Sequence, residues 1–297
     1  MRPGYCSAVF RDRFGILVNV FTFGVPSDRL FAHLVDVATA IEATSFDTLW
    51  LPDHMVQGPV GDIGDDRSPH TPIPDALTLL AALAVATERV RIGPLVSPIT
   101  LRHPATLAKS ITTTDVVSGG RAVLGIGAGW DADEHRRYGL EFPGPGERVR
   151  RLGDAVPICR AMFDDEAATY SGTCFSVEEA CNVPRPVSRI PILVGGAGKR
   201  TLRIAALHAD ACNPIGTTDE LRDAFDVFDR HCDEVERDRS EVAKQAGIMF
   251  HRVDAISPQV EAAFGLGADG VILVPWQLAL GPDDVHEIGE RLTREFS

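Results

Sequence analysis

The sequence predicts an α/β protein folded as a single (β/α)₈ barrel that spans residues 1–297. Short apolar runs alternate with longer helical patterns along almost the whole chain, and eight such alternations favour a barrel. The runs are nearly continuous in apolar residues, as expected for parallel strands covered on both faces. Neither observation proves closure, so an open, doubly wound sheet remains the alternative.

The expected elements follow in chain order, and strands are predicted at 16–23, 48–51, 90–96, 122–126, 192–194, 209–213, 246–250 and 270–274. The helical patterns between them cover 28–44, 75–86, 104–117, 146–163, 199–207, 219–236, 258–264 and 283–295.

Several helix starts carry recognisable chemistry. Ser27 or Asp28 can cap the first helix, Asp75 after a proline opens the second, and Thr217 with Glu220 suits the sixth.

Two connections are too long for simple turns, one after the second strand (56–73) and one before the fifth (164–189). Long loops of this kind are usually functional lids or mobile segments. The second connection has room for a short hairpin around 168–176.

The charge balance limits the kinds of partner. With 29 basic and 42 acidic residues the net charge is −13, which argues against nucleic acid or an anionic membrane surface. The apolar run at 16–23 is too short to cross a bilayer and has no signal-peptide pattern, so we expect a cytoplasmic protein. The six cysteines form no CxxC pair, and the acids at 131–134 suit a helix start, so no metal site is expected.

Asp53 and His54 follow the second predicted strand, at the edge where barrel enzymes place catalytic groups. A histidine there can donate a hydrogen bond or move a proton near neutral pH. A capping aspartate beside an exposed histidine is the equally weighted alternative.

Gly93, Pro94 and Leu95 lie inside the third predicted strand, where glycine and proline indicate a bulge or a close approach of a ligand. Pro94 also allows a cis bond between Gly93 and Pro94. The alternative is a strand that simply ends early.

The fourth strand runs into glycines spaced GxGxG, then Trp130 and Glu134. This spacing is not the GxGxxG of dinucleotide-binding folds. Small residues such as Gly127 would let a planar ring approach the backbone, with Trp130 as a wall. A glycine-rich turn with a partly buried tryptophan remains possible.

The fifth strand ends in the turn Gly195, Gly196, Ala197 and Gly198, directly before a helix. Free N–H groups and the helix dipole make such a turn suitable for a phosphate, and Lys199 and Arg200 add positive charge. The alternative is a tight turn with solvated basic residues.

Three segments together resemble the luciferase-like monooxygenase family, most closely its branch dependent on coenzyme F420. They are FDTLWLPDH (46–54), RVRIGPLVSPITLRHPATLAKSITTTDVVSGGRAVLGIGAGWDADEHRRYG (89–139) and IPILVGGAGKRTLRIAALHADACN (190–213).

The resemblance implies a barrel with a flavin or deazaflavin ring lying across the strand ends. It implies cofactor contact and proton handling for Asp53 and His54, and a backbone bulge, often a non-prolyl cis peptide, at Gly93–Leu95. The remaining residues implied to hold the cofactor are Gly127, Trp130, Glu134, Gly195, Gly196, Ala197, Gly198 and Asn213.

The resemblance therefore predicts an F420-dependent oxidoreductase that transfers a hydride between C5 of the deazaflavin and a small organic substrate, with His54 handling a proton. The alternatives are an FMN-dependent two-component monooxygenase with a separate flavin reductase, or a non-catalytic flavin- or deazaflavin-binding barrel. Relatives are often dimers, so a homodimer is expected.

The chain departs from the sugar-phosphate dehydrogenases of this family at two places. Asn19 and Phe21 stand near the position of their strand-1 glutamate, and Trp130 replaces an acid. These differences suggest a less polar substrate.

Overall fold

The structure is a computed structural model that describes residues 10–18, 25–56, 71–276 and 278–296. The predicted first strand is observed as β1 (Phe14–Leu17). Of the predicted strand 16–23, Val18 lies just past β1, and residues 19–23, with Asn19 and Phe21, lie outside the described residues. Most of the predicted loop 56–73 also lies outside them.

A nine-stranded parallel sheet forms the centre of the molecule, in the order β3-β2-β1-β11-β10-β9-β8-β5-β4. The other strands of this sheet are β2 (Thr48–Leu51), β3 (Arg91–Pro94), β4 (Ser97–Pro98), β5 (Leu124–Gly127), β8 (Ile192–Gly195), β9 (Ala211–Asn213), β10 (Ala243–Phe250) and β11 (Gly270–Pro275).

The two ends of this order, β3 and β4, belong to one stretch of chain. Only Leu95 and Val96 separate them, and β3 pairs with β2 while β4 pairs with β5. An isolated parallel bridge joins Ile92 of β3 to Ala122, which lies two residues before β5. It links this stretch of chain to β5 a second time. The sheet therefore curls into a nearly closed barrel, as predicted, with β3 and β4 acting as one interrupted strand.

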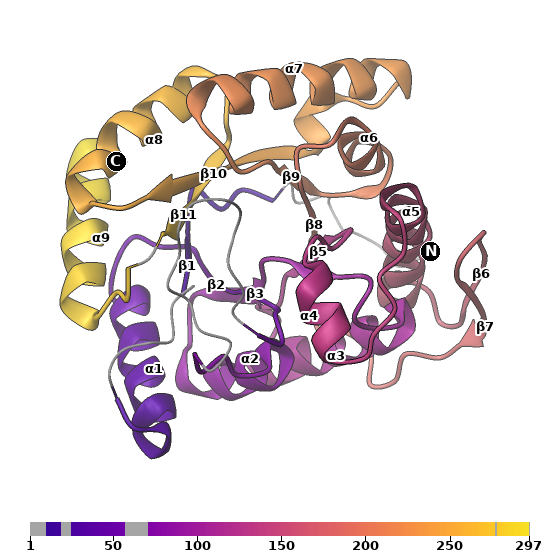
Figure 1. Ribbon diagram of the computed structural model, residues 1–297, viewed down its shortest axis with the longest axis horizontal. Helices are drawn as coiled ribbons and strands as arrows, with labels where there is room; N and C mark the ends of the chain where they lie inside the picture. Colours follow the sequence, from indigo (N-terminus) through magenta and orange to yellow (C-terminus); the bar gives the residue numbers. More distant parts are fainter. Residues whose placement is uncertain (1–9, 19–24, 57–70, 277, 297) are drawn as a thin grey trace.

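Helices surround the barrel (Figure 1). They are α1 (Ser27–Glu42), α2 (Ala76–Ala86), α3 (Pro104–Ser118), α4 (Ala132–Arg137), α5 (Pro145–Asp164), α6 (Lys199–His208), α7 (Thr218–Glu234), α8 (Ile256–Gly265) and α9 (Pro282–Phe296). Two 3₁₀ turns, η1 (Arg239–Glu241) and η2 (Val253–Ala255), and a hairpin of β6 (Ala168–Ser171) and β7 (Ser176–Ala180) complete the list. None of the described helices is both long and apolar enough to cross a membrane.

Two of the three predicted helix starts are confirmed. The side chain of Asp75 accepts the N–H of Thr78, and Thr217 and Glu220 form a capping box. The prediction that Ser27 or Asp28 caps α1 is wrong. The helix begins at Ser27, so the cap position falls on Pro26, which has no side-chain acceptor.

The barrel interior is filled by a small apolar cluster centred on Trp50, whose side chain is almost fully buried. A Cβ on Gly15 would lie 2.6 Å from Nε1 of Trp50, so this large ring fits because its neighbour has no side chain. A larger cluster fills the space between strands and helices. Among the described residues, side chains therefore fill the interior of the barrel.

Candidate active site

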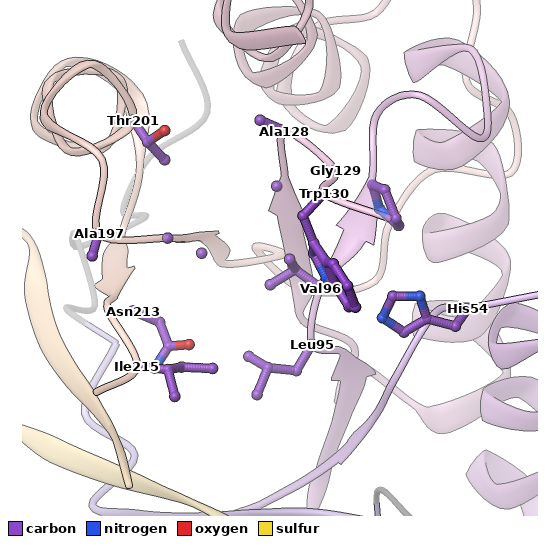
Figure 2. A pocket seen from close by; sticks show the side chains of 14 residues that line it. His54, Leu95, Val96, Ala128, Gly129, Trp130, Ala197, Thr201, Asn213 and Ile215 are labelled. Carbon is purple, nitrogen blue, oxygen red and sulfur yellow. The ribbon is translucent and has the colours of Figure 1, made fainter. Parts of the chain in front are cut away.

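A cavity of about 320 Å³ opens at the carboxyl ends of β4, β5, β8 and β9, a size typical of small-molecule sites. Eight residues of the sequence prediction line it: His54, Leu95, Gly127, Trp130, Gly195, Gly196, Ala197 and Asn213. Figure 2 shows His54 and Trp130 on one side, Ala197, Thr201 and Asn213 on the other, and Leu95 and Val96 between them.

The sequence prediction did not include six further lining residues: Val96, Pro98, Ala128, Gly129, Thr201 and Ile215. Ala128 and Gly129 lie within the predicted glycine-rich wall. Val96 lies in the interruption between β3 and β4, whose exact place no sequence pattern marks, and Pro98 lies in β4. Thr201 and Ile215 resemble ordinary helix and loop residues in the sequence.

The floor of the cavity is the interruption between β3 and β4. The peptide bond between Leu95 and Val96 is cis, a non-prolyl bond like the one that the resemblance implied. The suggestion of a cis bond at Gly93–Pro94 is wrong, since that bond is trans and the cis bond lies two residues later.

The glycines of β5 and β8 accommodate the side chain of Val96. A Cβ on Gly127 would lie 2.6 Å from Cγ2 of Val96, and one on Gly195 would lie 2.7 Å from Cγ1. Real Cβ atoms do not approach so closely, so both positions need glycine to admit Val96. The glycine-rich pattern therefore shapes an apolar floor at the strand ends.

Gly93, Pro94 and Gly198 do not line the cavity in the structure. A Cβ on Gly93 would collide with the carbonyl oxygen of Val123 and crowd Trp50, so this glycine serves the barrel interior. Pro94 lies opposite Leu51 in the pairing of β3 with β2, and Gly198 is the N-cap residue of α6.

His54 is held from behind by Glu134, which also does not line the cavity. Nδ1 of His54 lies 3.2 Å from Oε2 of Glu134, and the backbone N–H of Met55 donates to the same oxygen at 2.5 Å. On its other side His54 packs edge to face with Trp130, at 5.4 Å between ring centroids. The imidazole is therefore positioned by two neighbours, both from the segment after β5.

Asp53 is buried behind the lining residues, with 1% of its side chain exposed. Both of its oxygens accept from the guanidinium of Arg102, and Oδ2 also accepts from Oγ of Ser97 at 2.6 Å. Arg102 donates further to Oδ2 of Asp75 at 3.1 Å. The structure thus places Asp53 in a hydrogen-bonded network with Arg102 and Ser97, and this network fixes the end of β2 directly before His54.

The opposite wall contains a buried acceptor without a partner. Nδ2 of Asn213 donates to the backbone oxygen of Gln245 at 2.8 Å, which fixes the orientation of the amide. Oδ1 then has no hydrogen-bond partner although Asn213 is 1% exposed, and Figure 2 shows this oxygen on the cavity side. A buried carbonyl oxygen of this kind can accept a hydrogen bond from an N–H or O–H group of a bound molecule.

Beside Asn213 the turn Gly195–Gly198 leads into α6. Gly196 has φ +123°, a conformation that glycine adopts without strain, and the N-cap has no side-chain hydrogen bond. Unsatisfied N–H groups at the start of a ten-residue helix attract an anion. In the described chain no group of three or more His, Cys, Asp or Glu side chains suits a metal ion.

The chain belongs to the luciferase-like monooxygenase family, whose sequence pattern matches residues 13–263. It is 36% identical over 199 residues to an F420-dependent glucose-6-phosphate dehydrogenase of Microbacterium testaceum, covering 67% of this chain and 55% of that relative. It is 31% identical over 263 residues to a 5,10-methylenetetrahydromethanopterin reductase of Archaeoglobus fulgidus, covering 82% and 73%. The chain spans about half the length of the glucose-6-phosphate dehydrogenases it matches.

Solved structures share the fold at low sequence identity. The coenzyme F420 dependent tetrahydromethanopterin reductase of Methanopyrus kandleri superposes with a TM-score of 0.76 at 17% identity, covering 97% of this chain and all of that one. An F420-dependent secondary alcohol dehydrogenase in complex with an F420-acetone adduct gives 0.74 at 17% identity, covering 94% and 98%. These likenesses agree with the predicted barrel of the luciferase-like type.

Proposed function

We propose that the protein is an F420-dependent oxidoreductase that transfers a hydride between C5 of the deazaflavin and a small neutral organic molecule. The observation that carries the proposal is the cavity at the strand ends, where His54 faces an apolar floor and an anion-binding turn. Membership of the luciferase-like family and the names of its relatives favour F420 over FMN.

The residues present fit such a cofactor at three points. The N–H groups of the turn Gly195–Gly198 would hold its phosphate. The orphan oxygen of Asn213 would accept a hydrogen bond from a hydroxyl or N–H group of the cofactor. Val96, admitted by Gly127 and Gly195, would support the face of the ring.

When bound, the deazaflavin would supply the hydride chemistry. The chain's own part is to orient the reactants and to handle a proton at His54, the sole titratable side chain among the described lining residues. Trp130, at 52% exposure, would form the wall against which the substrate lies.

The substrate class follows from the same lining. The residues that the structure describes around the cavity include no Lys, Arg, Asp or Glu. A phosphorylated substrate would require a cationic partner for its second charge, and a neutral molecule would not. We therefore propose an uncharged alcohol, carbonyl or enone compound, and a homodimer remains a separate prediction.

Titration of the apoprotein with F420 and with FMN tests the cofactor, read by the fluorescence of each ring. We expect tight binding of F420 and weaker binding of FMN. Reduced F420 on the protein is then mixed with neutral ketones, aldehydes and enones, and with sugar phosphates.

Oxidation of the cofactor by a neutral compound is the expected result. Tight binding of FMN with oxygen consumption would support the monooxygenase alternative instead. Binding of F420 without turnover on any compound would favour the non-catalytic barrel. A His54→Ala variant that binds F420 and keeps full turnover would remove His54 from the proton-handling role.

A further inference from the structure

Glu134 is an ionised carboxylate with almost no access to water. Its side chain is 1% exposed, while that of His54 is 23% exposed. Burial by itself raises the pKa of Glu134, but the hydrogen bond and charge of His54 and the N–H groups of Met55 and Val56 outweigh it, so the pKa is lowered. Glu134 therefore stays ionised near neutral pH.

An ionised carboxylate can only accept hydrogen bonds. The hydrogen between Oε2 of Glu134 and Nδ1 of His54 must therefore be carried by Nδ1. In the neutral imidazole only one ring nitrogen carries hydrogen, which leaves Nε2 with a free lone pair.

Helix α4 fixes the place of this carboxylate. Asp131 caps the helix by accepting the N–H of Glu134 at 3.0 Å, and at the far end the hydroxyl of Tyr138 donates to the backbone oxygen of Met55 at 2.8 Å. Together with the bond from the Met55 N–H to Glu134, these contacts tie the loop after β2 to α4. The carboxylate and the imidazole therefore cannot shift independently.

We infer that Glu134 is the positioning residue of the cavity's histidine: it fixes His54 as the Nδ1–H tautomer, so that Nε2 serves the bound molecule. Glu134 itself does not line the cavity. The use of Nε2 in a reaction rests on the proposed function, whereas the tautomer is a property of the protein alone.

The tautomer decides what His54 can do. A bound deazaflavin would supply the hydride chemistry, and the lone pair of Nε2 would accept the O–H proton of an alcohol that is oxidised to a carbonyl compound. In the reverse direction the imidazolium would return that proton from Nε2 to the oxygen of the carbonyl compound. With the hydrogen on Nε2 instead, a neutral His54 could accept no proton from the cavity.

Nitrogen-15 NMR of the protein without any ligand tests the inference, because the chemical shifts of Nδ1 and Nε2 distinguish the two tautomers. The chain has nine histidines, and His54 is assigned by the signals lost in His54→Gln. In the neutral ring we expect the hydrogen on Nδ1 in at least about tenfold excess, as a hydrogen bond to a charged acceptor implies.

Glu134→Met should abolish this excess, because it keeps the length of the side chain and removes the acceptor. Glu134→Gln keeps a carbonyl acceptor and should retain part of the excess. Asp133→Asn is the matched control on the same helix, since Asp133 pairs with Arg136 and Arg137 on the surface. This control should leave the signals of His54 unchanged.

A wild-type His54 with its hydrogen on Nε2, or a tautomer that is the same in wild type and both Glu134 variants, would overturn the inference. If Glu134→Met does not fold, the wild-type shifts and Glu134→Gln still decide. Once a substrate is known, Glu134→Met should lower kcat more than Glu134→Gln does, with little change in KM. A correct tautomer without F420 binding would refute the proposed function and leave this inference standing.

Discussion

The ion pair between Asp53 and Arg102 offers the sharpest test of how the site is built. The carboxylate is 1% exposed and the guanidinium 22%. Nη2 of Arg102 donates to Oδ1 at 2.9 Å and Nη1 to Oδ2, a bidentate arrangement. Apart from Ser97, no other described side chain donates to this carboxylate.

Replacing Arg102 by Met keeps the aliphatic bulk and removes the cation. The buried carboxylate then keeps only the hydrogen bond of Ser97, and loss of one partner from a buried pair costs about 3–5 kcal/mol. The further contact of Arg102 with the half-exposed Asp75 adds about 0–1 kcal/mol at most. We expect Arg102→Met to lower the free energy of unfolding by about 3–5 kcal/mol.

Asp53→Asn in the same background removes the charge that Arg102→Met leaves unpaired. Urea unfolding of the wild type, both single variants and the double variant completes the thermodynamic cycle. The double variant should be more stable than Arg102→Met alone. A loss below about 1 kcal/mol in Arg102→Met, or no relief from Asp53→Asn, would falsify the assignment of Asp53 as a buried, charge-paired support.

Three further predictions follow from single contacts. Gly127→Ala should lower stability by about 1–3 kcal/mol through overpacking against Val96, and Val96→Ala in the same chain should relieve most of the loss in thermal unfolding. Trp130→Ala should leave stability within about 0.5 kcal/mol but weaken ligand binding about tenfold in fluorescence titration, because this ring is half exposed and walls the cavity. The pKa of Glu42 is lowered because hydrogen bonds from the N–H groups of residues 88–90 outweigh its burial. The stability that Glu42 contributes is therefore present above its ordinary pKa of 4.5 and lost as the pH falls through the lowered value. Urea titrations should show Glu42→Gln less stable than wild type by about 1–3 kcal/mol at pH 7, with the gap closing in acid; a gap that stays constant contradicts the assignment.

The sequence predicted most of the barrel because buried parallel strands leave a local signal. The run at 48–51 and the turn at 195–198 lie where they were expected, since both depend on neighbours in the chain. The run at 90–96 was read as one strand. Glycine and proline indicated a bulge at Gly93–Leu95, but they do not show which bond is irregular, and the cis bond lies between Leu95 and Val96.

The partners of the site residues were beyond the reach of sequence patterns. The glycine pattern predicted that another group lies close to the backbone near Gly127. That group is the side chain of Val96, which lies between β3 and β4. The pairing of His54 with Glu134 joins positions 80 residues apart, and that of Asp53 with Arg102 joins positions 49 apart. Such pairs exist only once the barrel has brought successive strand ends together.

The two buried carboxylates beside the cavity, Asp53 and Glu134, hold different parts of the site in place. Asp53 fixes the end of β2 through Arg102, and Glu134 orients the next side chain, His54, through α4. Neither carboxylate lines the cavity, so its described walls stay free of fixed charge while the single titratable side chain is held in one orientation. A change at Asp53 should therefore appear first in the free energy of unfolding, and a change at Glu134 first in the tautomer of His54. If both variants altered the same observable to the same degree, the two carboxylates would form one cooperative network rather than two separate supports.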